Sequence, residues 1–128
     1  MEIICDSSFL MAIVSNPISC IDNIESEIGN LKYIIPDYVI QELEAVKRTP
    51  NVKRSMVAKT AIEVCNTRFE IKKMEKRSTV DIEIINYAIS NKCAVATLDN
   101  GMIRQLKKAK ILTITLEKNR LAVANKYG

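Results

Sequence analysis

Four carboxylates in this sequence stand where an apolar run gives way to a turn or to a helical segment: Asp6, Glu42, Asp81 and Asp99. In an open α/β sheet the carboxyl ends of the strands gather around one crevice, so acids that are far apart in the sequence can meet there. Like charges in one pocket repel one another strongly and persist only where a cation neutralises them. The pattern therefore predicts a metal-dependent enzyme whose substrate also carries negative charge.

Three of these acids also have an ordinary structural explanation. Asp6 and Asp99 could cap the helices that follow them, and Asp81 could complete a capping box that begins at Ser78. All three nevertheless fall at the carboxyl end of an expected strand or at the start of the next helix, a placement that five other acids do not share: Asp22, Glu25, Glu27, Glu63 and Glu117. This joint placement favours a functional role over three unrelated caps.

The fourth acid could be either of two glutamates, because Glu42 and Glu44 lie on opposite flanks of the same apolar helix face. Spacing alone does not distinguish them. Glu44 has Arg48 one helical turn later as an ion-pair partner, whereas Glu42 has Val46 at the equivalent position. Glu42 is therefore the acid without an obvious structural partner, and it is assigned to the candidate site.

The sequence contains no histidine, and this excludes several classes of chemistry. Without imidazole there is no Ser-His-Asp or Cys-His hydrolase, no zinc site with histidine ligands and no histidine general base. Any hydrolytic chemistry must therefore use carboxylates and a hard cation. The cysteines form no Cys-x-x-Cys pair and are expected to be buried, reduced thiols: Cys5, Cys20, Cys65 and Cys93.

The net charge of +4, from 19 basic and 15 acidic residues, is modest, but its distribution is informative. Once the four candidate acids are set aside as metal ligands, the remaining surface is distinctly basic. A basic rim around an acidic, metal-loaded pocket suits a polyanion, although any single cluster could simply keep a helix face solvated. The clusters are Lys47-Arg48, Lys53-Arg54, Lys72-Lys73-Lys76-Arg77 and Arg104-Lys107-Lys108-Lys110.

The length of 128 residues and the 48% hydrophobic content predict one domain, residues 1–128, that buries a core without disulfides or a structural metal. Charged residues interrupt the apolar stretches well before the roughly 18 residues that a membrane span requires. Glu2 stands where a signal peptide would carry positive charge. We therefore expect a cytoplasmic protein that has no membrane partner.

Short β-branched runs alternate with longer segments of helical periodicity, which predicts βα units and an α/β fold with a mainly parallel sheet of about five strands. The strands are expected near residues 2–5, 32–35, 69–73, 93–97 and 111–115, and residues 121–124 could form a last strand. Helices are expected over residues 8–14, 18–28, 37–47, 52–68 and 81–91, with another from Gly101 to the basic run at 107–110. The apolar face of the longest helix is expected at Val57, Ala61, Val64 and Cys65.

Four segments of the sequence resemble the PIN-domain ribonucleases, and the resemblance extends from the first residues through the fifth expected strand. The segments are Ile3-Ile4-Cys5-Asp6-Ser7-Ser8, Ile35-Pro36-Asp37-Tyr38-Val39-Ile40-Gln41-Glu42-Leu43, Asp81-Ile82-Glu83-Ile84-Ile85 and Ala96-Thr97-Leu98-Asp99. The second and fourth look most similar to stand-alone archaeal PIN proteins related to the eukaryotic ribosomal-RNA-processing nuclease. The resemblance implies a three-layer α/β/α sandwich and an endoribonuclease that depends on Mg²⁺ or Mn²⁺.

The resemblance implies catalytic, metal-binding roles for four residues: Asp6, Glu42, Asp81 and Asp99. Thr97 and Ser7 would supply supporting hydroxyls near the same pocket. Many relatives carry paired acids where this chain has Asp81-Ile82. Glu83 lies about 200° around the helix from Asp81, so it is not expected to join the same metal ligands. The aspartate at position 99 is more typical of the RNA-processing branch than of the toxin ribonucleases.

The expected reaction is hydrolysis of an RNA phosphodiester by metal-activated water, leaving a 5′-phosphate and a 3′-hydroxyl, in the processing of ribosomal or other RNA. The expected partners are the RNA substrate, a second copy of the chain in a homodimer, and a ribosome-assembly partner. A toxin ribonuclease blocked by an antitoxin would share this fold and chemistry. A non-catalytic RNA- or protein-binding PIN domain would be expected to lack the acids. A Mg²⁺-binding signalling domain would carry adjacent acids after the first strand, where this chain has Asp6-Ser7.

Overall fold

The computed structural model describes residues 1–15, 32–117 and 120–124. In chain order its elements are β1 (Glu2–Cys5), α1 (Ser7–Ser15), β2 (Lys32–Pro36), α3 (Asp37–Lys47), α4 (Val52–Arg68), β3 (Glu70–Lys72), α5 (Val80–Asn91), β4 (Ala94–Ala96), α6 (Asn100–Lys108), β5 (Thr113–Glu117) and β6 (Arg120–Val123). The helix expected over residues 18–28, with Cys20 in it, lies outside the described residues. The described elements follow the predicted alternation of strands and helices.

The strands form one six-stranded sheet in the order β3-β2-β1-β4-β5-β6. Neighbouring strands from β3 to β5 run parallel, whereas β6 is antiparallel to β5, with Thr115 opposite Ala122. The prediction of an α/β fold with a mainly parallel sheet is confirmed. The segment expected as a possible last strand does pair with the sheet, so the described residues form six strands where about five were expected.

The strand that precedes Asp6 lies in the middle of the sheet, because β1 pairs with β2 on one side and with β4 on the other. Ile3, Ile4 and Cys5 are completely buried. Successive side chains of a strand point to opposite faces, so both faces of the sheet must be covered here. This explains why β1 is a continuous apolar run rather than an alternating one.

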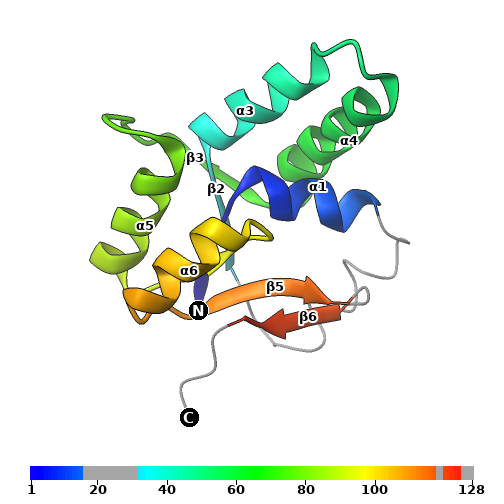
Figure 1. Cartoon of the computed structure of the whole chain (residues 1–128). Helices are drawn as coiled ribbons and strands as arrows, with labels where there is room; N and C mark the ends of the chain where they lie inside the picture. Colours follow the sequence, from blue (N-terminus) through cyan, green and yellow to red (C-terminus); the bar gives the residue numbers. More distant parts are fainter. Residues whose placement is uncertain (16–31, 118–119, 125–128) are drawn as a thin grey trace.

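The connections change direction in the middle of the sheet. From β1 the chain moves outward through β2 to β3, then returns past β1 to β4 and continues outward to β5. Crossovers between parallel strands are right-handed, so the two directions place α1, α3 and α4 on one face and α5 and α6 on the other. Figure 1 shows these two groups of helices apart from each other, which gives the predicted three layers. The carboxyl ends of β1 and β4 therefore border the crevice in which such sheets bind ligands.

The longest helix, α4, buries a face slightly different from the one expected. Its buried residues are Ala58, Ala61, Ile62 and Cys65. Val57 and Val64, which were expected to be in the core, are only half-buried. The face is turned toward Ala58 and Ile62 because α4 packs against the neighbouring helices α3 and α1 as well as β3.

Two expectations from the composition can be compared with the structure. Cys5, Cys65 and Cys93 are free and buried, as predicted. Burial raises the pKa of each thiol, to about 12 for Cys65, so these cysteines are poor nucleophiles at neutral pH.

In the described part of the chain, no helix has the length and apolar composition needed to cross a bilayer.

Candidate active site

Asp6 is the first residue after β1, and it is 5% exposed at the crevice. Its backbone N–H extends the strand pairing by donating to the carbonyl of Ala96 over 3.1 Å. Its Oδ1 accepts hydrogen bonds from Ser8 Oγ at 2.7 Å and from the N–H of Phe9 at 3.0 Å. Asp6 therefore does cap α1, and the same bonds hold its carboxylate in a fixed orientation at the end of β1.

Thr97 connects the end of β4 to Asp6. This fully buried residue donates from Oγ1 to Asp6 Oδ2, and the same oxygen accepts from the N–H of Asp99 at 3.1 Å. Ser8 Oγ lies 3.4 Å from Thr97 Oγ1 and accepts from the N–H of Leu98 at 3.0 Å. Both hydroxyl groups donate to one carboxylate, which is the contact expected of residues that support a metal-binding acid.

Asp99 follows β4 and is the N-cap residue of α6. Its Oδ1 accepts from the N–H of Gly101 at 2.8 Å and from the N–H of Met102 at 3.3 Å. Asp99 is exposed, and both of these bonds use the same oxygen, so Oδ2 is available to a ligand. A carboxylate has about four acceptor positions, so capping and metal binding are compatible for this residue.

Glu42 lies on α3 and is half-buried. Its pKa is raised, first by burial and then by the nearby charges of Asp6 and Asp81, although a hydrogen bond from Ser7 and the charge of Lys76 act in the opposite direction. The structure thus places Glu42 beside Ser7 and toward the acids of the crevice.

The other glutamate of this helix has a different environment. Glu44 forms an ion pair with Lys47 at 3.8 Å, one turn along α3. The expected pairing with Arg48 is therefore wrong, because the nearer basic residue of the last turn takes this position. Glu44 is nevertheless the structurally paired acid of the two, as its sequence context suggested.

Asp81 lies in the first turn of α5, but it does not form the expected capping box with Ser78. The N-cap residue is Thr79, whose Oγ1 accepts from the N–H of Ile82 at 3.4 Å. The helix begins one residue later than the box requires, which leaves the carboxylate of Asp81 exposed and outside the cap. Partial burial and the charge of Asp99 raise the pKa of Asp81.

The four acids lie within electrostatic range of one another. Burial is the first cause of the raised pKa values of Asp6, Glu42 and Asp81, and in each case a neighbouring acid raises the pKa further. The negative charge of Asp81 raises the pKa values of both Asp6 and Glu42, and the negative charge of Asp99 raises the pKa of Asp81. The fold thus brings together carboxylates from the ends of β1 and β4 and from the helices α3 and α5.

These acids surround an open site rather than a closed metal centre. In residues 1–15, 32–117 and 120–124, no three acidic or cysteine side chains come together as a compact ligand set. The donors are carboxylate oxygens, which suit hard cations, and Mg²⁺ usually keeps several waters and binds through one or two carboxylates and substrate phosphates. An open set of oxygen donors therefore fits Mg²⁺ or Mn²⁺, whereas zinc favours nitrogen and sulfur ligands.

Two residues near the site were not singled out from the sequence. Ser8 has its hydroxyl on Asp6, and the Asp-x-Ser spacing of residues 6 to 8 is a signal that could have identified it. Asp37 Oδ1 accepts from the N–H groups of Tyr38 and Met74, both at 3.0 Å. No local pattern indicates the second bond, because it joins the start of α3 to the distant loop between β3 and α5.

Glu83 does not face the crevice acids. It lines a separate hollow beside Tyr38, and its charge contributes to raising the pKa of Tyr38 to about 12, after burial as the main cause. This position agrees with the expectation that Glu83 lies on a different side of α5 from Asp81.

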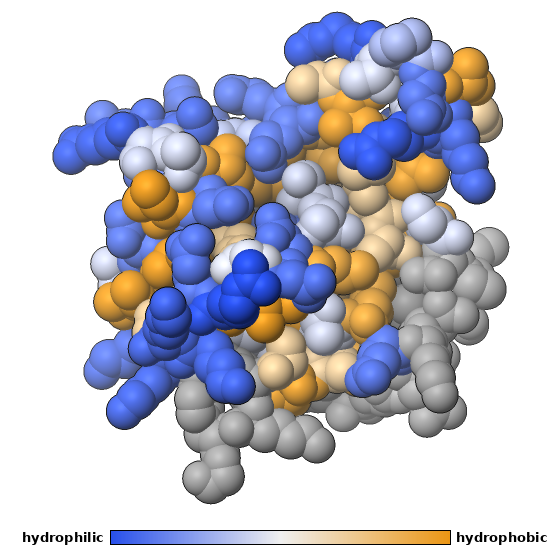
Figure 2. Space-filling view, viewed as in Figure 1, coloured by the Kyte–Doolittle hydropathy of each residue, from blue (hydrophilic) through white to orange (hydrophobic). Residues whose placement is uncertain are grey.

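Hydrophilic residues cover several parts of the surface around the helices. Figure 2 shows them over the turn between α3 and α4, over the loop that precedes α5, and along α6. Lys76, in the loop before α5, is close enough to Glu42 to lower its pKa. The expected basic rim therefore reaches at least one of the candidate acids.

The comparisons with known proteins agree with this architecture. The PIN domain endonuclease Utp24 has a similar structure, with a TM-score of 0.73 and 20% identity over 95% of this chain and 90% of that one. A domain of a functionally unknown protein from Methanocaldococcus jannaschii has a TM-score of 0.61 and 17% identity over 91% of each chain. No curated protein gave a significant match. Residues 3–119 match the PIN-like domain family, and the chain therefore belongs to that family.

Proposed function

We propose that this protein is a divalent-metal-dependent endoribonuclease in which Asp6, Glu42, Asp81 and Asp99 bind the metal and act in catalysis. The observation that carries the proposal is the gathering of these acids at the point where the connections of the sheet reverse direction. Mutual repulsion and burial raise the pKa values of three of them, and a divalent cation would relieve that repulsion.

The residues have distinct roles in this proposal. Asp6 is the most rigid acid, because three hydrogen bonds fix its carboxylate, and Thr97 and Ser7 keep Asp6 and Glu42 in position. Asp81 and Asp99 are exposed and can approach the substrate side of the site. A bound Mg²⁺ or Mn²⁺ ion would polarise the scissile phosphate and lower the pKa of the attacking water.

RNA is the proposed substrate because the loop before α5 brings the positive charge of Lys76 to the acids, and further basic residues lie on the surface. Affinity would come mainly from contacts between phosphates and Lys or Arg side chains, so binding should weaken as salt concentration rises. We favour processing of ribosomal or other RNA over a toxin role, because an aspartate at position 99 is more typical of the processing branch of the family. We further propose that the protein acts in the cytoplasm and that it forms a homodimer.

The first experiment measures cleavage of a structured RNA with Mn²⁺, with Mg²⁺ and with EDTA. Wild type should cleave with either metal and lose activity in EDTA. Asp6→Asn, Asp99→Asn and Glu42→Gln should each reduce the rate by more than about 100-fold, beyond the roughly 10- to 100-fold typical of residues that only support a metal ligand. Products should carry 5′-phosphates and 3′-hydroxyls.

Glu44→Gln is the matched control, because it makes the same charge change on the same helix at an acid that pairs with Lys47. It should retain the wild-type rate. Equal cleavage by wild type and all the variants would indicate a contaminating nuclease, and the proposed function would be withdrawn. A loss in Glu44→Gln as large as that in Glu42→Gln would show that the effect is not specific to the site.

A further inference from the structure

A hollow of about 280 Å³ lies on the side of α5 that does not carry Asp81. It is bordered by α3, by the loop before α5 and by one face of α5. The lining residues are Tyr38, Met74, Glu75, Glu83, Asn86, Tyr87, Ser90 and Asn91. The volume lies below the roughly 300–1,000 Å³ of pockets for drug-sized ligands, so the hollow suits a single small ring system.

The hollow adjoins the candidate active site through shared elements. Asp37 holds the loop before α5 by accepting from the N–H of Met74, whose side chain lines the hollow. Lys76, further along this loop, lies near Glu42 of the acid cluster. Asp81 and Tyr87 are six positions apart on α5 and lie on different sides of that helix, but the loop before α5 borders both the acids and the hollow. A strand bound at the acids would therefore reach the hollow across this loop.

Tyr87 is the aromatic side chain best placed to stack on a ligand in this region. Among the described aromatic residues, Phe9, Tyr33 and Tyr38 are buried, and Phe69 packs on Tyr33 with ring centroids 4.8 Å apart. Tyr87 is half-buried at the wall of the hollow. A ring in this position can supply the stacking surface that single-stranded nucleic acid uses.

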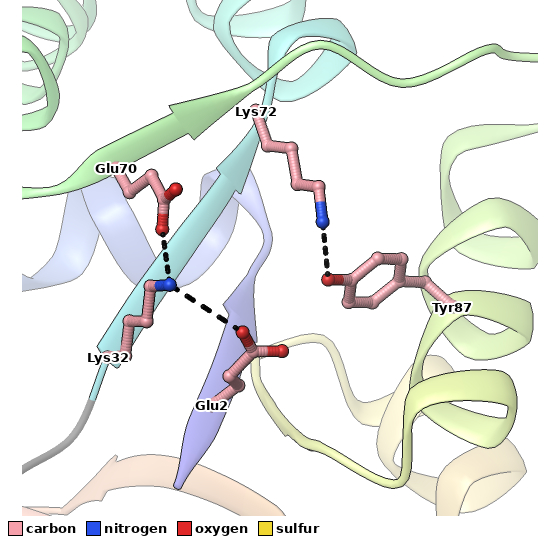
Figure 3. Close-up of polar contacts among 5 residues, drawn as sticks. All are labelled: Glu2, Lys32, Glu70, Lys72 and Tyr87. Atoms are coloured by element: carbon pink, nitrogen blue, oxygen red, sulfur yellow. Dashed lines mark hydrogen bonds and ion pairs between the residues drawn. The ribbon is translucent and has the colours of Figure 1, made fainter.

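The position of Tyr87 is fixed from the neighbouring strand. Figure 3 shows Lys72 of β3 extended toward Tyr87, with Nζ 3.4 Å from the phenol oxygen and 5.5 Å from the ring centroid. In the same view Lys32 bridges Glu70 at 3.2 Å and Glu2 at 3.9 Å, which links the adjacent strands β3, β2 and β1. Lys72 thus contacts Tyr87 through both the phenol oxygen and the ring, and these contacts orient the ring.

The polar lining selects for a ligand edge that donates hydrogen bonds. Glu75 is already paired with Arg77 at 3.0 Å. Among the described ion pairs none involves Glu83, so its carboxylate is available as an acceptor beside Asn86. Guanine carries a ring N–H and an amino group side by side on its Watson–Crick edge, and these two donors match the two oxygens of a carboxylate.

We infer that this hollow binds a nucleobase of the RNA strand, with a preference for guanine, through stacking on Tyr87 and hydrogen bonding to Glu83. The inference deepens the proposed function and rests on it for the identity of the ligand. It makes the hollow a specificity subsite that adjoins the metal-binding acids.

The test measures equilibrium binding in EDTA, so that cleavage does not contribute, by fluorescence anisotropy of labelled RNA. The ligands are an oligouridine with one central guanine, the same strand with inosine, which lacks the amino group, and the same strand with an abasic site. Wild type should bind the inosine strand, which keeps the stacked base, about 5- to 100-fold more tightly than the abasic strand. Inosine should lose about 10-fold relative to guanine, as expected for a hydrogen bond to a charged group.

The variants separate stacking from hydrogen bonding. Tyr87→Ala should lower the preference for guanine over the abasic strand by about 5- to 100-fold, the contribution of stacking, whereas Tyr87→Phe, which keeps the ring, should retain it. Glu83→Gln should bind guanine and inosine equally. Glu63→Gln is the charge-matched control, because it changes an exposed acid on α4 and should behave as wild type.

Each outcome supports or overturns the inference. Equal binding of all strands by wild type, or no binding of any of them, overturns it. So does an arginine-rich peptide that binds wild type and loses affinity in Glu83→Gln, since the hollow would then serve a cationic protein partner. Cleavage that depends on Asp6 without any guanine preference would refute the subsite and leave the nuclease intact. A guanine preference without cleavage would support the subsite and refute the nuclease.

Discussion

Asp6 has the most completely defined surroundings of the candidate acids. Its carboxylate accepts from Ser8 Oγ, from the N–H of Phe9 and from Thr97 Oγ1. These donors favour the ionised form, but burial favours the protonated form and is the largest effect, so the pKa of Asp6 is raised. Loss of one donor should therefore raise this pKa further and weaken the hold of Asp6 on a cation.

Thr97→Val tests this coupling with little change in side-chain shape. We expect the free energy of unfolding to fall by about 1–3 kcal/mol, because Asp6 loses a donor and the N–H of Asp99 loses its acceptor. The cleavage rate should fall by roughly 10- to 100-fold. The acidic limb of the pH–rate profile should move to higher pH, because more of Asp6 is then protonated. Denaturant unfolding and rates measured across pH provide both values.

Thr113→Val is the control for a merely structural effect. Thr113 is also fully buried, and its Oγ1 donates to the carbonyl of Ile111 at 3.0 Å, at the start of β5. Its replacement should lower stability to a similar degree and leave the shape of the pH–rate profile unchanged. If the two variants changed the profile equally, Thr97 would act through stability alone, and its role in positioning Asp6 would be rejected.

At the scale of elements, Asp37 joins two segments that the active site needs. It stands at the first position of α3, after Pro36 at the end of β2, and its Oδ1 accepts from the N–H groups of Tyr38 and Met74. The second bond fixes the start of the loop that carries Lys76 toward Glu42. We therefore expect Asp37 to position this loop rather than to bind the metal.

Asp37→Ala should release this loop. We expect a loss of about 1–2 kcal/mol in the free energy of unfolding, typical of a lost cap or buried hydrogen bond. RNA binding should also weaken, because Lys76 is no longer held near the site, and KM should rise more than kcat falls. Titration with RNA and steady-state kinetics measure these changes.

Asn51→Ala is the matched control for that variant. Asn51 caps α4 by accepting from the N–H of Arg54 at 3.1 Å, so its loss should cost a similar amount of stability. It makes no contact with the loop before α5 among the described hydrogen bonds. An equal rise in KM for Asn51→Ala would mean that general destabilisation explains the effect, and the role assigned to Asp37 would fail.

The elements themselves were largely predictable, because local signals define them. The α4 helix spans Val52–Arg68, as periodicity and the flanking residues predicted. The choice of cap was less predictable: Ser78 and Thr79 can both cap a helix, and the path of the loop decides that Thr79 does so. The bond of Ser8 to Asp6 has a local signal in the Asp-x-Ser spacing, whereas its proximity to Thr97, 89 positions away, arises only when β1 pairs with β4.

At the scale of the whole molecule, the strand order creates the site. The sequence predicts that Asp6 and Asp99 follow strands, but periodicity does not reveal that β1 and β4 are neighbours. That adjacency, with the reversal of the connections, places both acids at one crevice. The family resemblance supplied the missing long-range information, and local propensity could not. The acids also cap helices, so their structural and proposed functional roles are compatible.

The raised pKa values of the acids have a consequence for the stability of the whole molecule. In the unfolded chain Asp and Glu titrate near their ordinary values of about 4. In the folded, metal-free protein Asp6, Glu42 and Asp81 keep their protons to higher pH. Between the unfolded and folded pKa values the native state therefore binds more protons, so stability must fall as pH rises through that window.

We therefore expect the melting temperature of the metal-free protein to be highest in the mildly acidic range just above pH 4 and to decrease toward neutral pH. Asp6→Asn should flatten this decrease, because the amide has no charge to bury, whereas Glu63→Gln should not change it. Mg²⁺ or Mn²⁺ should raise the melting temperature by a few °C at neutral pH, and by less in acid, where protons compete for the same carboxylates. Thermal unfolding across pH, with and without metal, measures all three effects. A melting temperature that rises toward neutral pH without metal, or that metal does not change, would contradict the view that these acids repel one another across a cation site.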